Sequence, residues 1–211
     1  MNEKDRKSRK IKDGLYTIFF MFFITVVFIS IISFIYVKTR GKIKLNEQLK
    51  LKRAILFAGN IEYDNSNEND ILDKYSKYVK EIEVENTDNY FEIYKDGAKS
   101  GYVFLVTGPG LWGKIDTAIG FKQDLKTMTG IEFLKQNETP GLGARITETW
   151  FKEQFENKVA PIEKAVGENK EAGKKEFNAI TGATSSSKAV MKIINKSAKN
   201  VKKRYDLMEE E

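Results

Sequence analysis

The uncharged stretch from Gly14 to Val37 restricts the structure of this chain more than any other feature. It reads GLYTIFFMFFITVVFISIISFIYV, and as an α-helix it would span roughly 36 Å, whereas the hydrocarbon core of a bilayer is about 30 Å thick. A cleaved signal peptide is the alternative, but its apolar region is usually about 7 to 15 residues long and ends at a small-residue cleavage site. This stretch is longer and continues into the basic residues 38–44, so we predict an uncleaved transmembrane helix over residues 14–37.

Basic residues flank this stretch on both sides. Because lysine and arginine concentrate on the cytoplasmic side of membranes, the small excess before the stretch favours a cytoplasmic N-terminus, residues 1–13, but favours it only weakly. The flanking residues are Lys4, Arg6, Lys7, Arg9, Lys10 and Lys12 before the stretch and Lys38, Arg40, Lys42 and Lys44 after it.

Two residue types are missing, and their absence limits the chemistry. The sequence has 211 residues, no cysteine and no histidine. This excludes disulfides, thiolate nucleophiles, zinc clusters, haem and iron–sulfur ligation, and imidazole acid–base catalysis, and we predict neither a metal site nor a catalytic residue. The net charge of +6 comes from lysines spread along the chain without a nucleic-acid motif, so we expect no nucleic-acid partner.

Helical patterns precede the central part of the chain. Residues 38–60 are expected to form a stalk helix, because Leu45, Leu49 and Leu56 recur at near-helical spacing before Gly59-Asn60. Asparagine and aspartate caps in residues 65–86 introduce a second expected helix, whose apolar residues are Ile71, Leu72, Tyr75, Tyr78 and Val79.

Alternating patterns then predict a sheet. Residues 90–107 form two alternating runs around Asp96-Gly97, which indicates a hairpin, and residues 112–121 and 128–135 continue the period of two. Residues 144–158 return to a helical period, and a last helix is expected from about Ser185 to Lys203. We therefore predict an α+β domain over residues 61–205, with an antiparallel sheet, flanking helices and a frayed acidic tail over 206–211.

The segment TGPGLWGK, residues 107–114, is the first of three that could carry chemistry. Its glycines permit close backbone approach, and Trp112 in such a turn could stack on a flat ligand. The alternative is a tight turn with a half-buried tryptophan.

The segment ETPGLGAR, Glu138 to Arg145, is the second. It is either an ordinary turn that leads into a helix, or a loop whose backbone N–H groups line a site.

The segment TGATSSS, residues 181–187, is the third. Thr184 stands where the last helix is expected to begin, so the unpaired N–H groups and the positive end of the helix dipole would favour an anion there. Alternatively, Thr184 or Ser185 is simply the N-cap of the helix. A cap needs one hydroxyl, and the surplus favours an anion site such as a phosphate.

The motifs TGATSS and ETPGLG, with the preceding glycine and tryptophan turn and a single N-terminal membrane helix, resemble a known family. These are the FMN-binding subunits of bacterial ion-translocating oxidoreductases: the G subunit of the Rnf complex and the C subunit of the sodium-translocating NADH:quinone reductase. The resemblance implies that Thr184 carries one FMN through a phosphoester, installed from FAD by a separate magnesium-dependent flavin transferase. Lacking a long insertion between anchor and sheet, the chain looks closer to the Rnf protein.

Two positions depart from the family pattern. Asn178 stands where the family commonly has an aspartate six residues before the acceptor threonine, and Gln136 stands where a histidine often precedes ETPGLG. The first difference concerns the efficiency of flavin transfer more than FMN binding.

The resemblance also implies a set of cofactor contacts and a location. Thr181, Ala183 and Ser185 are expected around the phosphate, and Trp112, Glu138, Thr139, Leu142 and Gly143 around the flavin. Gly182 and Asn178 are expected to be cofactor-binding as well. The chain would be a single-pass subunit of the bacterial cell membrane with its domain outside the cytoplasm. It would relay electrons between ferredoxin and NAD beside other membrane subunits, coupled to Na⁺ or H⁺ movement. A cofactor-free anchored binding or assembly module and a stand-alone extracytoplasmic FMN carrier are the alternatives.

Overall fold

The computed structural model describes residues 3–83 and 89–208. The chain divides into two compact units, and the long first helix contributes residues to both. Helix α1 spans Glu3–Ala58, whereas the compact units are Met1–Glu47 and Gln48–Glu211. The expected boundary between a membrane helix and a stalk at residue 37 is not marked by a break in α1. Residues 48–58, which we assign to the stalk, belong to the domain instead.

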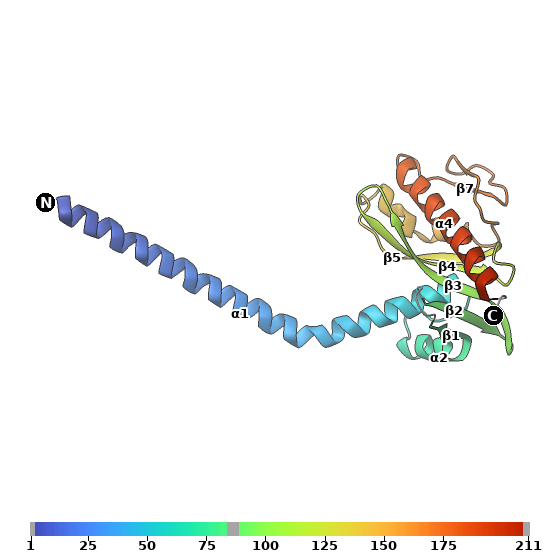
Figure 1. The fold of residues 1–211 in the computed structure, drawn as a ribbon, viewed down its shortest axis with the longest axis horizontal. Coiled ribbons are helices and arrows are strands. Elements are labelled where there is room, and N and C mark those ends of the chain that lie inside the picture. Colours follow the sequence, from blue (N-terminus) through green and yellow to red (C-terminus); the bar gives the residue numbers. More distant parts are fainter. Residues whose placement is uncertain (1–2, 84–88, 209–211) are drawn as a thin grey trace. The chain divides into compact units, whose positions relative to one another are not determined.

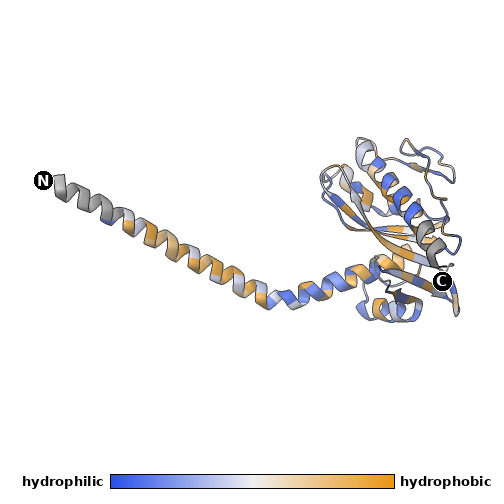
Figure 2. Ribbon diagram, viewed as in Figure 1, coloured by the Kyte–Doolittle hydropathy of each residue, from blue (hydrophilic) through white to orange (hydrophobic). Residues whose placement is uncertain are grey.

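The first unit contains one segment that is long and apolar enough to cross a membrane. This segment lies within Gly14–Ala58, and its most apolar window has a mean hydropathy of 2.9. Among the described residues, no residue of that window is buried. Figure 2 shows the hydrophobic residues along this part of α1. The hydroxyls of Thr25, Ser30 and Thr39 donate to the carbonyls four residues earlier, so these polar groups are satisfied within the helix.

The second unit is built on a sheet whose strands alternate between two hydrophobic clusters. Along β3, Tyr102 and Phe104 pack in one cluster and Val103 and Leu105 in the other, as the period of two requires. The antiparallel strands are arranged in chain order: β1 (Val79–Ile82), β2 (Tyr90–Lys95), β3 (Ala98–Pro109), β4 (Lys114–Lys122) and β5 (Met128–Lys135).

Helices cover both faces of this sheet (Figure 1). The last turns of α1 and helix α2 (Glu68–Tyr78) pack on one face through Leu49, Ile55 and Ile71. Helix α4 (Thr184–Met208) packs on the other face through Val190 and Ile193, together with the segment η1 (Gly143–Thr147) and α3 (Thr149–Glu153). The predicted α+β class with an antiparallel sheet is confirmed.

Three expected helix limits are wrong. Val79 begins β1 rather than continuing α2, because residues 79–82 pair with residues 90–93 of β2. The helical pattern of residues 144–158 is divided at Glu148, whose extended backbone separates η1 from α3. Helix α4 continues to Met208, beyond Lys203 and into the expected tail, whose residues 209–211 lie outside the described part.

A short parallel pair was not expected from the sequence. Strands β6 (Lys164–Val166) and β7 (Glu176–Asn178) pair with each other and lead directly into the turn before α4. This pair positions the start of α4 relative to the rest of the domain.

A close approach of α1 to the sheet depends on Gly120 of β4. A methyl group at this position would overlap the carbonyl oxygen of Ala58 and the hydroxyl of Thr129, which donates to that oxygen at 2.6 Å. We predict that Gly120→Ala lowers the free energy of unfolding by about 1 to 3 kcal/mol or more, as overpacked cores do. Urea denaturation of the full chain measures this. Gly173→Ala is the control, since a methyl group there meets only the Glu176 carboxylate at 3.7 Å, and equal stability of the two variants would contradict the prediction.

Candidate functional site

The turn between β7 and α4 brings the hydroxyl-rich segment to the surface of the domain. Gly182 has a φ of +78°, which side-chain-bearing residues rarely adopt, and a methyl group there would lie 3.3 Å from Leu142. The N–H of Ala183 donates to the carbonyl of Ile180 at 3.0 Å, which closes the turn just before α4. Thr184 and Ser185 are exposed at the first positions of the helix.

The beginning of α4 has no side-chain cap. The first bond of the helix runs from the N–H of Ser187 to the carbonyl of Ala183, so the N-cap position holds an alanine, which has no acceptor. In the described part of the chain, no side chain accepts from the N–H groups of Thr184, Ser185 or Ser186. The capping explanation for Thr184 and Ser185 is therefore wrong, and the helix start is left open to an anion.

Two of the five hydroxyls belong to buried serines and are held by hydrogen bonds within the domain. Ser187 accepts from the N–H of Ile180 at 3.0 Å and donates to Ala183 at 3.1 Å. Ser186 donates to the carboxylate of Glu138. The remaining three, on Thr181, Thr184 and Ser185, belong to exposed residues.

Glu138 links two segments that are distant in sequence. Its side chain is buried and accepts from the N–H groups of Leu111 at 2.8 Å and Trp112 at 3.3 Å through Oε1, and from Ser186 through Oε2. We expected this carboxylate beside the ring of a ligand, but its oxygens are turned toward donors within the protein. Glu138 therefore holds the Trp112 turn against the start of α4.

Two glycines make this approach possible. A methyl group on Gly143 would overlap the hydroxyl of Ser186, and one on Gly110 would overlap the Glu138 carboxylate. The loop between Glu138 and Gly143 closes on the carbonyl of Thr139, which accepts from Leu142 and Ala144 at 3.1 Å each.

Large apolar side chains are exposed beside this turn. Leu111, Trp112 and Leu142 are 56%, 70% and 45% exposed, and among the described large apolar residues of the second unit only Leu72 has comparable exposure. Trp112 is therefore not the half-buried tryptophan of the alternative interpretation. An exposed apolar group beside an open helix start suits a ligand with an anionic end and a flat apolar end.

Glu168 was not identified from the sequence, yet it contacts the hydroxyl-rich turn directly. Its carboxylate accepts from the N–H of Thr181 at 2.8 Å and from Nη2 of Arg145 at 3.1 Å. The hydrogen bonds from Thr181, followed by that from Arg145, lower the pKa of Glu168 to about 2. Glu168 lies in a polar loop with no motif, so no sequence signal could have found it.

The side chain of Asn178 is bonded to the loop that carries Glu168. Its side-chain amide donates to the carbonyls of Gly167 at 2.9 Å and Lys170 at 2.7 Å, on either side of Glu168. Asn178 therefore anchors the loop that carries Glu168 and reaches the turn only through it.

Comparison with known proteins relates this site to flavoproteins. Residues 110–199, which include every candidate site residue, match the family model described as "FMN-binding domain". The chain is 40% identical to the G subunit of the Na⁺-translocating ferredoxin:NAD⁺ oxidoreductase complex of Acetobacterium woodii, over 57% of this chain and only 60% of that relative. It is 30% identical to the G subunit of the ion-translocating oxidoreductase complex of Methanosarcina acetivorans, over 81% of this chain and 85% of that relative.

Solved structures of related proteins share the fold. The crystal structure of the C subunit of the Na⁺-translocating NADH-quinone reductase of Parabacteroides distasonis has a TM-score of 0.61 and 27% identity, covering 75% of this chain and 92% of that chain. The corresponding Shewanella oneidensis structure has a TM-score of 0.63 over 72% of this chain and 91% of that chain, but at 20% identity it supports the fold alone.

The link made by Glu138 predicts unequal effects of two substitutions. Glu138→Ala would leave two backbone N–H groups and Ser186 without an acceptor, and we expect a loss of about 1 to 3 kcal/mol of unfolding free energy. Glu138→Gln keeps Oε1 as an acceptor and offers an N–H group to the Ser186 oxygen, so it should retain most of the stability. Thermal melts of both variants compare them, and an equal loss in Glu138→Gln would mean that charge rather than hydrogen bonding matters.

The contact between Glu168 and Thr181 predicts a specific pH dependence. Because the pKa is lowered from 4.5 to about 2, the contact contributes fully above about pH 4.5 and is lost as the pH falls through about 2. The amide signal of Thr181 in NMR spectra should shift with a midpoint near pH 2. Glu168→Gln should abolish this transition, whereas a midpoint near 4.5 would show that the contact does not form.

Proposed function

Because the chain belongs to the family of G subunits of ion-translocating oxidoreductase complexes, we propose that it relays electrons through an FMN group bound covalently to Thr184. The observation that carries this proposal is the open start of α4. An exposed threonine hydroxyl stands there beside three N–H groups that have no acceptor among the described residues. The complex to which it belongs would be an Rnf-type ferredoxin:NAD oxidoreductase that moves Na⁺ or H⁺. One relative is named as a subunit of a Na⁺-translocating complex of this kind, and another as a subunit of a proton-translocating one.

The phosphate end of the cofactor suits the residues of the turn. A phosphoester on Thr184 would receive N–H groups from the first turn of α4 and would lie at the positive end of the helix dipole. Thr181, Ala183 and Ser185 complete the surroundings, while Gly182 lets the backbone turn toward the ligand. Glu168 already occupies the N–H of Thr181, so that group is not available to the phosphate.

The ring end would lie against the exposed apolar side chains. Trp112 offers a flat face for stacking, and Leu111 and Leu142 extend the apolar surface beside it. FMN supplies the electron-carrying chemistry when bound, and the protein supplies position and electrostatics. Glu138 acts on the ring through the Trp112 turn that it holds, and Thr139 and Gly143 shape the facing loop.

The apolar part of α1 would anchor this domain in the bacterial cell membrane. Helix length and hydropathy support a single span, and the relatives are subunits of complexes whose names describe ion translocation. Its partners would be other membrane subunits and, during maturation, a flavin transferase that adds the FMN. Electron relay needs proximity between carriers rather than proton transfer, which agrees with a sequence without histidine or cysteine.

The attachment site is tested by Thr184→Ala in protein co-expressed with a flavin transferase. We expect mass spectrometry to show one FMN adduct in the wild type and none in the variant, because the acceptor hydroxyl is gone. Stability should change little, since Thr184 does not cap the helix. Ser185→Ala, which removes the neighbouring exposed hydroxyl, is the matched control and should keep the adduct. An adduct on Thr184→Ala would place the attachment elsewhere.

The orientation is tested by protease added to intact spheroplasts. We propose that residues 1–13 are cytoplasmic and that the domain is outside, on the basis of the family resemblance. The nearly balanced flanking lysines and arginines decide little, because long domains can be translocated largely regardless of flanking charge. The domain should therefore be digested from outside without lysis. Digestion only after lysis would reverse the topology.

A further inference from the structure

The carboxylate of Glu168 connects the hydroxyl-rich turn to the segment from Glu138 to Arg145. One oxygen accepts from the N–H of Thr181 at 2.8 Å, and the other accepts from Nη2 of Arg145 at 3.1 Å. Arg145 also forms an ion pair with Glu148 at 3.2 Å, so its guanidinium is held on two sides. Glu168 therefore ties together two of the segments that are proposed to surround the FMN.

Asn178 in turn fixes the loop that carries Glu168. Its side-chain amide donates to the carbonyls of Gly167 at 2.9 Å and Lys170 at 2.7 Å, while its backbone is bonded separately to the side chain of Gln154. Both bonds to the loop require N–H donors at position 178, and a carboxylate there would have none to offer. The donors of this side chain, rather than its size, therefore hold the loop.

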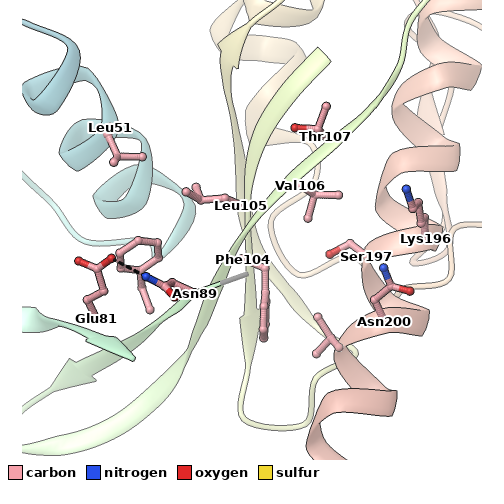
Figure 3. Close-up of a pocket in the computed structure, with 12 residues that line it drawn as sticks. Leu51, Glu81, Asn89, Phe104, Leu105, Val106, Thr107, Lys196, Ser197 and Asn200 are labelled. Carbon is pink, nitrogen blue, oxygen red and sulfur yellow. Dashed lines mark hydrogen bonds between the residues drawn. The ribbon is translucent and has the colours of Figure 1, made fainter. Parts of the chain in front are cut away.

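Helix α4 is held on the sheet by apolar packing that is separate from this polar loop. Val190 and Ile193 are buried, and a methyl group on Gly108 of β3 would overlap Ile193. In Figure 3, Val106 of β3 points toward α4, whereas Leu105 points away from it. Without the loop contacts, we therefore expect the turn before α4 to loosen while the helix stays in place.

We propose that Glu168 and Asn178 are positioning residues for the attachment of FMN to Thr184, because they hold the turn in the conformation that the flavin transferase binds. This inference rests on the function proposed above. In the attachment reaction, the hydroxyl oxygen of Thr184 forms a bond to the FMN phosphorus of FAD and the bond from that phosphorus to AMP breaks, so that AMP and the hydroxyl proton are released. Glu168 and Asn178 act on the turn through Thr181 and not on these atoms.

A positioning role predicts a change in binding rather than in the chemical step. If the turn adopts its ordered conformation only part of the time, the apparent affinity of the transferase for the chain falls in proportion to that fraction. The rate from the bound complex stays the same. The KM of the transferase for the chain should therefore rise, with little change in kcat. A role in overall stability alone would change neither constant while the domain stays folded.

The experiment measures initial rates of flavin attachment to the full chain, purified in detergent from a host without a flavin transferase. The concentration of the chain is varied with purified transferase, FAD and Mg²⁺ present, and covalent FMN is quantified by mass spectrometry. We expect Glu168→Ala, which removes both contacts, to raise KM about fivefold. Asn178→Asp keeps the size of the side chain but removes both donors, so the rise should be similar. Hydrogen exchange at the Thr181 amide should become faster in both variants, because this amide loses its acceptor.

Two control variants carry the same kinds of change away from the turn. Glu163→Ala breaks the ion pair with Lys175 at 2.7 Å. Asn195→Asp removes from α4 the amide that donates to the carbonyl of Ile162 at 2.8 Å. Both controls should leave KM and the exchange at Thr181 unchanged, even where they lower the melting temperature.

The outcomes separate this inference from the attachment site itself. An adduct at Thr184 that forms with the wild-type KM in Glu168→Ala and Asn178→Asp would overturn the positioning role. An equal rise of KM in Asn195→Asp would also overturn it, since the effect would then follow stability. A fall in kcat with unchanged KM would do the same, because it would place these residues at the reacting atoms. The lack of any adduct on the wild type, by contrast, would reject Thr184 as the acceptor.

Discussion

The carboxylate of Glu138 is the point at which three segments of the domain meet. It receives the backbone of the Trp112 turn on one oxygen and the hydroxyl of Ser186 on the other, while its own backbone begins the loop to Gly143. A buried carboxylate is tolerated only with such donors, because an unpaired one would be costly to remove from water. The exposed residues around the turn, including Trp112 and Thr184, are positioned by a group that does not itself reach the surface.

A second carboxylate holds the other end of the same turn. Glu168 accepts from Thr181, and Asn178 fixes the loop around Glu168 through two carbonyls. The turn is therefore held at Thr181 and at Ser186, with Gly182 and Thr184 between them. This arrangement explains how a segment containing a glycine with positive φ keeps a defined position at the protein surface.

The elements of the fold and of the candidate site that depend on neighbouring residues could be predicted from the sequence. The hairpin at Asp96-Gly97, the apolar helix and the hydroxyl-rich helix start follow from residue type and period, and the structure contains each of them. Contacts that depend on distant partners could not be predicted. Val79 continues a helical pattern but pairs with Ile93, and Glu168 becomes important only because Arg145 and Thr181 approach it. The inward direction of Glu138 likewise depends on Ser186, which is far from it in sequence.

The open start of α4 also has a consequence for the order in which the protein matures. Before any anion is present, the amides of Thr184, Ser185 and Ser186 have no acceptor among the described residues, so they should exchange hydrogen with solvent readily. A phosphate held there would give these amides partners and extend the protected part of the helix by its first turn. The acceptor segment would thus be most accessible to a modifying enzyme when it is unmodified, and attachment of the cofactor would itself close that access.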